Sequence, residues 1–440
     1  MFFAADSEML AVLCQLQMSE RWPAERMREA QGLQLAALLE HAVRTIPLQA
    51  QRLQLRNASS IERAAQDPGR WRELPLLTRE EVRAHSMDLR SDDFSPSHGR
   101  THVKKTSGST GQPVEVLRTD VTQRMWEAVA LRDHLWRQRD ARLPSAVIRA
   151  LTPAAPPPDG LQYDTWGYPY DRLWQTGPSH IMDMVADVKA HADWLRRVKP
   201  GYLLTYPTIA AALLENFAAH GAPPIQEIIC VGEPISAALA ASARDVLGAQ
   251  IGANYTSNEV GYMALLCPDC SQYHVQSESV LLEVLDERGA ACGPGEVGRV
   301  VVTDLHNFAM PLIRYEVGDY AEVGEACAAG RTLPSLRRIL GRRRNMLLHP
   351  DGRRHWPMTG FGRYHEAAPI RQYQIVQHTR QEIEVRLVAD HELTSAQLAA
   401  LAEIILTALG HPFTLRFTQH ADRLDRGSGG KFEEFLCLAT

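Results

Sequence analysis

The chain has 440 residues, of which 45% are hydrophobic and 22% charged, so its composition is that of a soluble globular protein and excludes the disordered and fibrous classes. The length predicts two domains, one large and one small. The 47 basic and 52 acidic residues give a net charge of −5, which argues against a nucleic-acid-binding surface.

The start of the chain and its cysteines indicate the compartment. Residues 1–8 lack a basic start, and acidic residues interrupt their apolar run, which argues against a secretory signal. No stretch approaches the ~20 apolar residues of a membrane helix. The seven cysteines are too irregularly spaced for a disulfide framework. We therefore expect a cytoplasmic protein with no membrane partner.

The N-terminal region is predicted to be helical. Residues 8–55 carry apolar side chains at helical spacing, and Pro47 is expected to end that pattern. Thr78 is expected to cap a short helix with Glu80 and Glu81 in its first turn. Both segments are interpreted as packing elements.

Glycines and hydroxyl side chains alternate in residues 106–113, directly after Lys104 and Lys105 and before an expected strand at 114–117. Such glycines let the backbone N–H groups approach a ligand closely, and the hydroxyls add donors. The residues concerned are Thr106, Ser107, Gly108, Ser109, Thr110 and Gly111. With the two lysines, this composition favours a polyphosphate ligand; a Ser/Gly-rich surface linker is the alternative. No lysine follows the last glycine, so this is not the loop that ends in G-K-S/T.

Large aromatic residues are dense between 163 and 174, after an amphipathic helix at 120–138 and a proline-rich loop at 153–158. They are Tyr163, Trp166, Tyr168, Tyr170 and Trp174. Their density predicts a loop that lines an apolar cavity, and ordinary core packing is the alternative.

Short apolar runs then alternate with helical segments. Strands are expected at 202–206, 225–231 and 250–255, with helices at 208–220 and 236–248 between them. This alternation predicts βαβ units and a mostly parallel sheet. Ligands of such sheets bind beyond the carboxyl ends of the strands.

Cys267, Cys270 and His274 have the spacing C-x₂-C-x₃-H, which places three ligands suited to tetrahedral zinc on one short loop. A fourth ligand must come from elsewhere in the chain. A closed site of four protein ligands is structural and does not react with substrate. Ordinary free thiols are the alternative.

The C-terminal region predicts a small α+β domain, with strands at 372–377 and 382–389 and a helix at 394–409. The expected fold class is therefore α/β. A large domain, residues 1–341, is expected to contain mixed and parallel sheets flanked by helices, and a small domain, residues 342–440, is expected to contain Lys431.

Several motifs together resemble the adenylate-forming superfamily of acyl-CoA synthetases, peptide-synthetase adenylation domains and luciferases, and within it the phenylacetate–CoA ligase branch. The run T-S-G-S-T-G-Q-P at 106–113 resembles the phosphate loop of that superfamily. N-Y-T-S-N-E at 254–259, R-Y-E-V-G-D at 314–319, G-R at 341–342 and G-K at 430–431 resemble its later motifs.

The resemblance implies roles for individual residues. Asp319 is expected to accept hydrogen bonds from the ribose hydroxyls, Tyr255 to stack on adenine, and Glu259 to hold Mg²⁺. Arg342 is expected to face the ribose or α-phosphate, and Lys431 to bridge the acid and the α-phosphate. The expected ATP-binding residues are Thr106, Ser107, Gly108, Ser109, Thr110, Gly111, Gly232, Glu233, Pro234, Asn254, Tyr255, Thr256, Asp319 and Arg342. The expected catalytic residues are Lys431, Glu259 and Thr110.

An acid pocket and the fourth zinc ligand also follow from the resemblance. The expected substrate-pocket residues are Trp166, Tyr168, Tyr170, Tyr206 and Gly232. Residues 327–331 resemble the C-x-C-G-R segment of zinc-bearing relatives, which favours Cys327 over Cys292 as the fourth ligand. At 349–357 the chain is longer and more basic than typical phenylacetate–CoA ligases, and Asn345 stands at the position of the hinge pivot.

The resulting hypothesis is an ATP- and Mg²⁺-dependent ligase that activates an aromatic carboxylic acid of specialised metabolism as an acyl-adenylate. Coenzyme A is the expected acceptor, with an amine or a carrier-protein thiol as the alternative. A zinc-stabilised protein that binds ATP or an acid without catalysis is the non-enzyme alternative. Relatives are often dimers, so a homodimer is a further expectation.

Overall fold

The computed structural model describes residues 4–105, 114–151, 157, 159–342, 346–355, 364–421, 424 and 433–439. The chain divides into two compact units, a large one up to Ile339 and a small one from Leu340 onward. Among the described helices, none has the length and apolar run needed to cross a bilayer.

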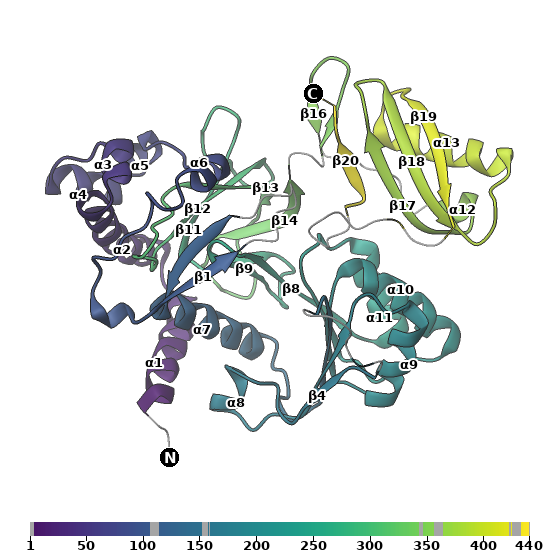
Figure 1. Cartoon of the computed structure of the whole chain (residues 1–440), viewed down its shortest axis with the longest axis horizontal. Helices are drawn as coiled ribbons and strands as arrows, with labels where there is room; N and C mark the ends of the chain where they lie inside the picture. Colours follow the sequence, from purple (N-terminus) through teal and green to yellow (C-terminus); the bar gives the residue numbers. More distant parts are fainter. Residues whose placement is uncertain are drawn as a thin grey trace. The chain divides into compact units, whose positions relative to one another are not determined.

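Helices form the N-terminal part of the large unit (Figure 1). They are α1 (Ala4–Ser19), α2 (Ala24–Thr45), α3 (Pro47–Leu53), α4 (Ala58–Gln66), α5 (Pro68–Glu73), α6 (Arg79–Ala84) and the 3₁₀ turn η1 (Pro96–His98). Pro47 ends the long helical pattern and also opens α3, because proline fits the first helical position. Thr78 caps α6 in a capping box with Glu81, as predicted.

The antiparallel strands β1 (Thr101–Lys105) and β2 (Glu115–Thr119) flank the predicted phosphate loop. Lys105 Nζ lies 2.7 Å from Glu115 Oε1, so one of the two lysines ahead of the loop is paired with a carboxylate. Helix α7 (Asp120–Trp136) follows β2 directly and is capped by Thr119.

A sheet of 12 described strands forms the centre of the large unit, in the order β11-β12-β13-β14-β10-β9-β8-β7-β6-β3-β5-β4. Its strands are β3 (Ser145–Arg149), β4 (Leu161–Tyr163), β5 (Ser179–Asp183), β6 (Tyr202–Thr205), β7 (Glu227–Cys230), β8 (Gln250–Ser257), β9 (Gly261–Leu266), β10 (Tyr273–Val275), β11 (Val280–Leu285), β12 (Val297–Asp304), β13 (Tyr315–Val323) and β14 (Ser335–Arg342).

The sheet is mixed, and the βαβ strands predicted at 202–255 are parallel within it, as expected. Strands β8, β7, β6, β3 and β5 are parallel neighbours, whereas β8 to β10 and β11 to β13 pair antiparallel. The reason is the connection: helices join the parallel strands, and short turns join the later ones. Helices α9 (Val188–Val198), α10 (Pro207–His220) and α11 (Ala237–Leu247) share a buried core with the parallel strands; α8 (Tyr170–Leu173) precedes β5.

The small unit contains a four-stranded sheet in the order β19-β18-β17-β20. Its elements are β15 (Leu347–Leu348), β16 (Arg354–His355), α12 (Tyr364–Ala367), β17 (Ile370–Gln377), β18 (Glu382–Ala389), α13 (Ser395–Leu409), β19 (Thr414–His420) and β20 (Phe435–Cys437). Leu401, Ile405 and Leu409 of α13 are buried with Ile375 and Val385 of the sheet. The two strands and the helix predicted here are confirmed.

Candidate active site

Glu259 lies in the turn between β8 and β9, with its carboxylate buried against two groups from distant segments. Arg79, the first residue of α6, places Nη1 2.5 Å from Glu259 Oε1, and the Tyr315 hydroxyl donates to the same oxygen over 3.4 Å. Burial and the neighbouring Glu259 raise the pKa of Tyr315, so this hydroxyl is a neutral donor. Among the described residues, Glu259 Oε2 has no hydrogen-bond partner.

Arg118 of β2 contacts the backbone of the same turn. Its guanidinium carbon lies 4.4 Å from the Trp126 ring centroid, and Nη2 donates to the Asn258 carbonyl over 2.5 Å. Burial lowers the pKa of Arg118 to about 10, which leaves it charged at neutral pH. The strand that follows residues 106–113 therefore fixes the backbone that presents Glu259.

A second side-chain contact between these segments joins Tyr255 of β8 to Asp319 of β13. The Tyr255 hydroxyl donates to Asp319 Oδ2 over 3.0 Å. Gly318 has a φ of 90°, a left-handed conformation that glycine adopts without strain, directly before Asp319. Beside Tyr255, the buried Oδ1 of Asn254 has no hydrogen-bond partner among the described residues, so it can accept from a ligand donor.

The start of the R-Y-E-V-G-D motif performs a structural task. Arg314 is buried with a φ of 53°, and its Nε and Nη2 contact the two carboxylate oxygens of Glu283 at 3.1 and 3.0 Å. Nη1 donates to the carbonyl of Arg72 over 2.8 Å and also to that of Leu74. This arginine joins the end of the N-terminal helices to β11 and β13.

Three predicted ATP-binding residues and Tyr206 follow the carboxyl ends of β6 and β7. Thr205 and Cys230 are paired across these strands, so Tyr206 and Gly232 lie at the same edge of the sheet. The Glu233 carboxylate accepts hydrogen bonds from the backbone N–H and hydroxyl of Thr208, at 3.1 and 3.2 Å. These bonds attach the loop with Gly232 and Pro234 to the first turn of α10.

The aromatic segment lies elsewhere, at the amino ends of the parallel strands. Trp166 Nε1 donates to the carbonyl of Leu143, just before β3, over 2.9 Å. Its ring lies 5.5 Å from that of Tyr202, the first residue of β6, and 5.7 Å from that of Tyr170. Tyr168 is 58% exposed. The structure therefore does not bring Trp166, Tyr168 and Tyr170 together with Tyr206 and Gly232. The sequence predicted otherwise because the number of aromatic residues in a loop does not indicate which edge of the sheet the loop covers.

Some predicted residues lie outside the described ranges. They are Thr106, Ser107, Gly108, Ser109, Thr110, Gly111 and Lys431, together with the side chain of Arg342. Thr256 is exposed at the end of β8.

The predicted metal ligands do come together. One ligand atom each from Cys267, Cys270, His274 and Cys327 lies within 4.8 Å of the others; Cys292 is not among them. His274 Nδ1 lies 2.9 Å from the carbonyl of Leu333, which leaves Nε2, 3.4 Å from Cys270 Sγ, directed at the group. Burial raises the pKa of the Cys270 thiol to about 12.

Sequence reasoning missed Arg79 and Arg118. An arginine in the first turn of a helix opposes the helix dipole, and this misfit at Arg79 was an available signal. Arg118 offered no signal, because its partners are carbonyl groups 139 and 140 positions away.

Comparisons with known proteins agree with the predicted resemblance. No family model matches the chain. The phenylacetate-coenzyme A ligase of Thermus thermophilus is 26% identical over 357 residues, which cover 75% of this chain and 73% of that protein.

Solved structures of similar fold include 2-hydroxyisobutyryl-CoA ligase in complex with R3-HIB-AMP, with a TM-score of 0.72, 17% identity, and coverage of 95% of this chain and 90% of that one. The same enzyme with 2-HIB-AMP and CoA gives a TM-score of 0.58 at 18% identity and coverage of 95% and 91%. For O-succinylbenzoate coenzyme A synthetase from Bacillus subtilis with AMP, the TM-score is 0.51, the identity 16%, and the coverage 76% and 67%. The predicted fold class is confirmed.

Proposed function

We propose that this chain, which has the fold of the adenylate-forming acyl-CoA ligases, is an ATP-dependent acid–thiol ligase. It activates a carboxylic acid as an acyl-adenylate and transfers the acyl group to coenzyme A. The observation that carries the proposal is the double contact between two motif segments, Tyr255 with Asp319 and Glu259 with Tyr315. The similarity to phenylacetate-coenzyme A ligase supports it.

In the first step, an oxygen of the acid attacks the α-phosphorus of ATP and pyrophosphate leaves. Asp319 accepts hydrogen bonds from the ribose, and the unpartnered Asn254 Oδ1 suits the amino group of adenine. Residues 106–111 bind the phosphates, and Lys431 neutralises charge between the acid and the α-phosphate. In the second step, the thiol sulfur of coenzyme A attacks the acyl carbon, and AMP leaves.

Glu259 is proposed as the Mg²⁺ ligand. Oxygen ligands suit this cation. Arg79 contacts Oε1 of the Glu259 carboxylate, so we propose Oε2 as the atom that binds Mg²⁺. Magnesium bound there neutralises phosphate charge. Arg79 and Tyr315 hold the carboxylate in position.

The acid is proposed to be aromatic, because the relative from Thermus thermophilus is a phenylacetate-coenzyme A ligase. Coenzyme A is the proposed acceptor, and we propose that basic residues of 349–357 bind its phosphates. We keep residues 342–440 as the mobile domain that delivers Lys431.

The test is pyrophosphate release with a panel of aromatic and aliphatic acids, followed by mass analysis of the product after adding coenzyme A, amines or a carrier-protein thiol. We expect release with aromatic acids and a coenzyme A thioester. An amide product would show that the acceptor is an amine, and a carrier-bound product would show that it is a carrier-protein thiol. Either result would contradict coenzyme A as the acceptor. Absence of release with every acid would contradict ligase activity and favour a binding protein.

We also propose that Cys267, Cys270, His274 and Cys327 bind a structural Zn²⁺. Three sulfurs and one imidazole nitrogen within 4.8 Å are the donor set of closed zinc sites, and the His274–Leu333 contact sets the tautomer that such a site requires. Elemental analysis of protein purified without chelator tests this directly.

A further inference from the structure

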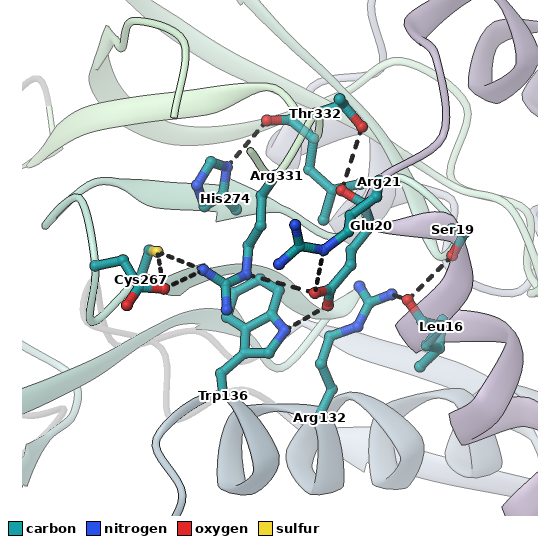
Figure 2. A network of polar contacts seen from close by, with 12 residues as sticks. Leu16, Ser19, Glu20, Arg21, Arg132, Trp136, Cys267, His274, Arg331 and Thr332 are labelled. Carbon is teal, nitrogen blue, oxygen red and sulfur yellow. Dashed lines mark hydrogen bonds and ion pairs between the residues drawn. The ribbon is translucent and has the colours of Figure 1, made fainter. Parts of the chain in front are cut away.

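The segment from Gly330 to Leu333 lies between the Cys/His group and the turn that joins α1 to α2. Cys327, three residues before this segment, is a candidate metal ligand. At the end of the segment, the Leu333 carbonyl accepts a hydrogen bond from the candidate ligand His274. In between, Arg331 and Thr332 contact the α1–α2 turn, residues 19–24. Figure 2 shows Arg331 between Cys267 and Glu20.

Arg331 contacts the metal loop through one nitrogen. Nη1 lies 3.2 Å from Cys267 Sγ and 2.5 Å from Asp269 Oδ2. The guanidinium carbon lies 4.5 Å from the ring centroid of Trp136, which fixes the plane of the fork. Arg331 therefore contacts a candidate ligand sulfur and a carboxylate of the same loop at once.

The same arginine reaches the N-terminal helices through Glu20. Arg331 Nε lies 3.7 Å from Glu20 Oε1, and the indole of Trp136 donates to Glu20 Oε2 over 2.6 Å. Both Arg331 and Glu20 are buried, with 9% and 7% of their surfaces exposed. A buried ion pair that loses one partner leaves an uncompensated buried charge. Separating Arg331 from Glu20 is therefore unfavourable in free energy.

Thr332 adds a second attachment of the same segment to the turn. Its backbone N–H donates to the Glu20 carbonyl over 2.9 Å, and its hydroxyl donates to the Trp22 carbonyl over 2.5 Å. These bonds satisfy two carbonyls of the α1–α2 turn, which follows the end of α1 at Ser19.

We propose that Arg331 is a positioning residue that links zinc binding to the packing of α1 and α2. This inference rests on the proposed zinc site. With zinc bound, Cys267 is a fixed anionic partner for Arg331, and Arg331 and Thr332 hold the α1–α2 turn. Removal of zinc releases residues 327–333, and the turn opens more often.

The test combines zinc affinity with hydrogen exchange of the full chain. Arg331→Gln is expected to weaken zinc binding about 10- to 100-fold, measured by competition with a chromophoric chelator. Removal of zinc from the unsubstituted protein is expected to speed amide exchange in residues 19–24 about 10- to 100-fold. In zinc-loaded Arg331→Gln the exchange of this turn is already fast, and chelation changes it little.

Arg21→Gln is the matched control, because Arg21 Nε lies 4.0 Å from the same Glu20 oxygen, while its side chain is 60% exposed. It is expected to change neither quantity, and exchange in β6 and β7 of the large unit reports whether each variant is folded. Absence of zinc from the unsubstituted protein would overturn the metal site itself. Bound zinc, with exchange in residues 19–24 insensitive to chelation or to Arg331→Gln, would overturn the linkage alone.

Discussion

The candidate nucleotide site and the Cys/His group are both assembled from distant segments, but their polar atoms are satisfied differently. Glu259 and Asp319 already have protein partners, in Arg79, Tyr315 and Tyr255. The four candidate ligand atoms instead lie within 4.8 Å of one another, Cys267 and His274 are almost fully buried, and Arg331 contacts Cys267. We therefore expect the first site to be stable without its ligand and the second to depend on the proposed Zn²⁺. Substitutions should reduce catalysis at the first and folding stability at the second.

The largest effect on catalysis is expected from Lys431→Ala. Loss of a positive charge aimed at the developing negative charge should slow pyrophosphate release about 10²- to 10³-fold. The thermal midpoint should not change. Lys189→Ala is the control, because Lys189 is an exposed lysine paired with Asp193. Unchanged pyrophosphate release would remove Lys431 from the mechanism.

Asp319→Asn should weaken ATP binding more than it lowers the stability of the fold. Hydrogen bonds to a charged group contribute about 1.5–3 kcal/mol, so we expect the KM for ATP to rise about 10- to 100-fold. Steady-state kinetics with saturating acid measures this value, with Asp193→Asn as a surface control. If the thermal midpoint falls and the KM for ATP does not change, Asp319 stabilises the fold and does not bind ATP, which would contradict the difference drawn between the two sites.

Removing zinc should have the opposite profile. Loss of a ligand held well above its dissociation constant costs about 3 kcal/mol, which should lower the thermal midpoint by roughly 5–10 °C. At low temperature the KM for ATP should stay the same. Cys270→Ser should reproduce the effect, and Cys292→Ser should not. Equal midpoints with and without chelator would show that the cluster does not brace the fold.

The smallest effect concerns His134, which packs in the aromatic segment, 4.8 Å from Trp174. Burial lowers its pKa to about 4, against about 6.5 in the unfolded chain. Between these values only the unfolded chain binds the proton, so stability falls as the pH drops from about 6.5 to 4.

His134→Phe removes this titration. In urea unfolding at pH 7 and pH 5, the variant should lose less stability than the unsubstituted protein, with an unchanged KM for ATP at pH 7. Equal losses in both proteins would exclude His134 as a source of the acid sensitivity.

Local patterns located most elements that carry the site. Alternating apolar residues predicted β8, and the spacing of Cys267, Cys270 and His274 placed three ligands on one loop. The resemblance to zinc-bearing relatives preferred Cys327 over Cys292, and Cys327 is the one that lies beside the other three; its role as a ligand and the zinc ion itself stay predictions. These successes share a cause, because the information lies within a few residues of each position.

The contacts of three arginines could not be predicted in this way. Arg79, Arg118 and Arg331 have hydrogen-bond or ion-pair partners 62 to 311 positions away, and a local pattern assigns a charged side chain to the surface. The aromatic segment failed for a related reason. Its composition indicated packing, but only the three-dimensional connection of α7, β3 and β6 decides which edge of the sheet it covers.

Arg314 has a consequence for how such proteins are recognised. The first letter of R-Y-E-V-G-D ties helices to strands through Glu283 and two carbonyls, and the last letter supplies the carboxylate beside Tyr255. A chain that lost Asp319 would keep every bond made by Arg314. The signature therefore reports shared architecture more securely than it reports enzymatic competence, and inactive descendants of this fold can carry most of it.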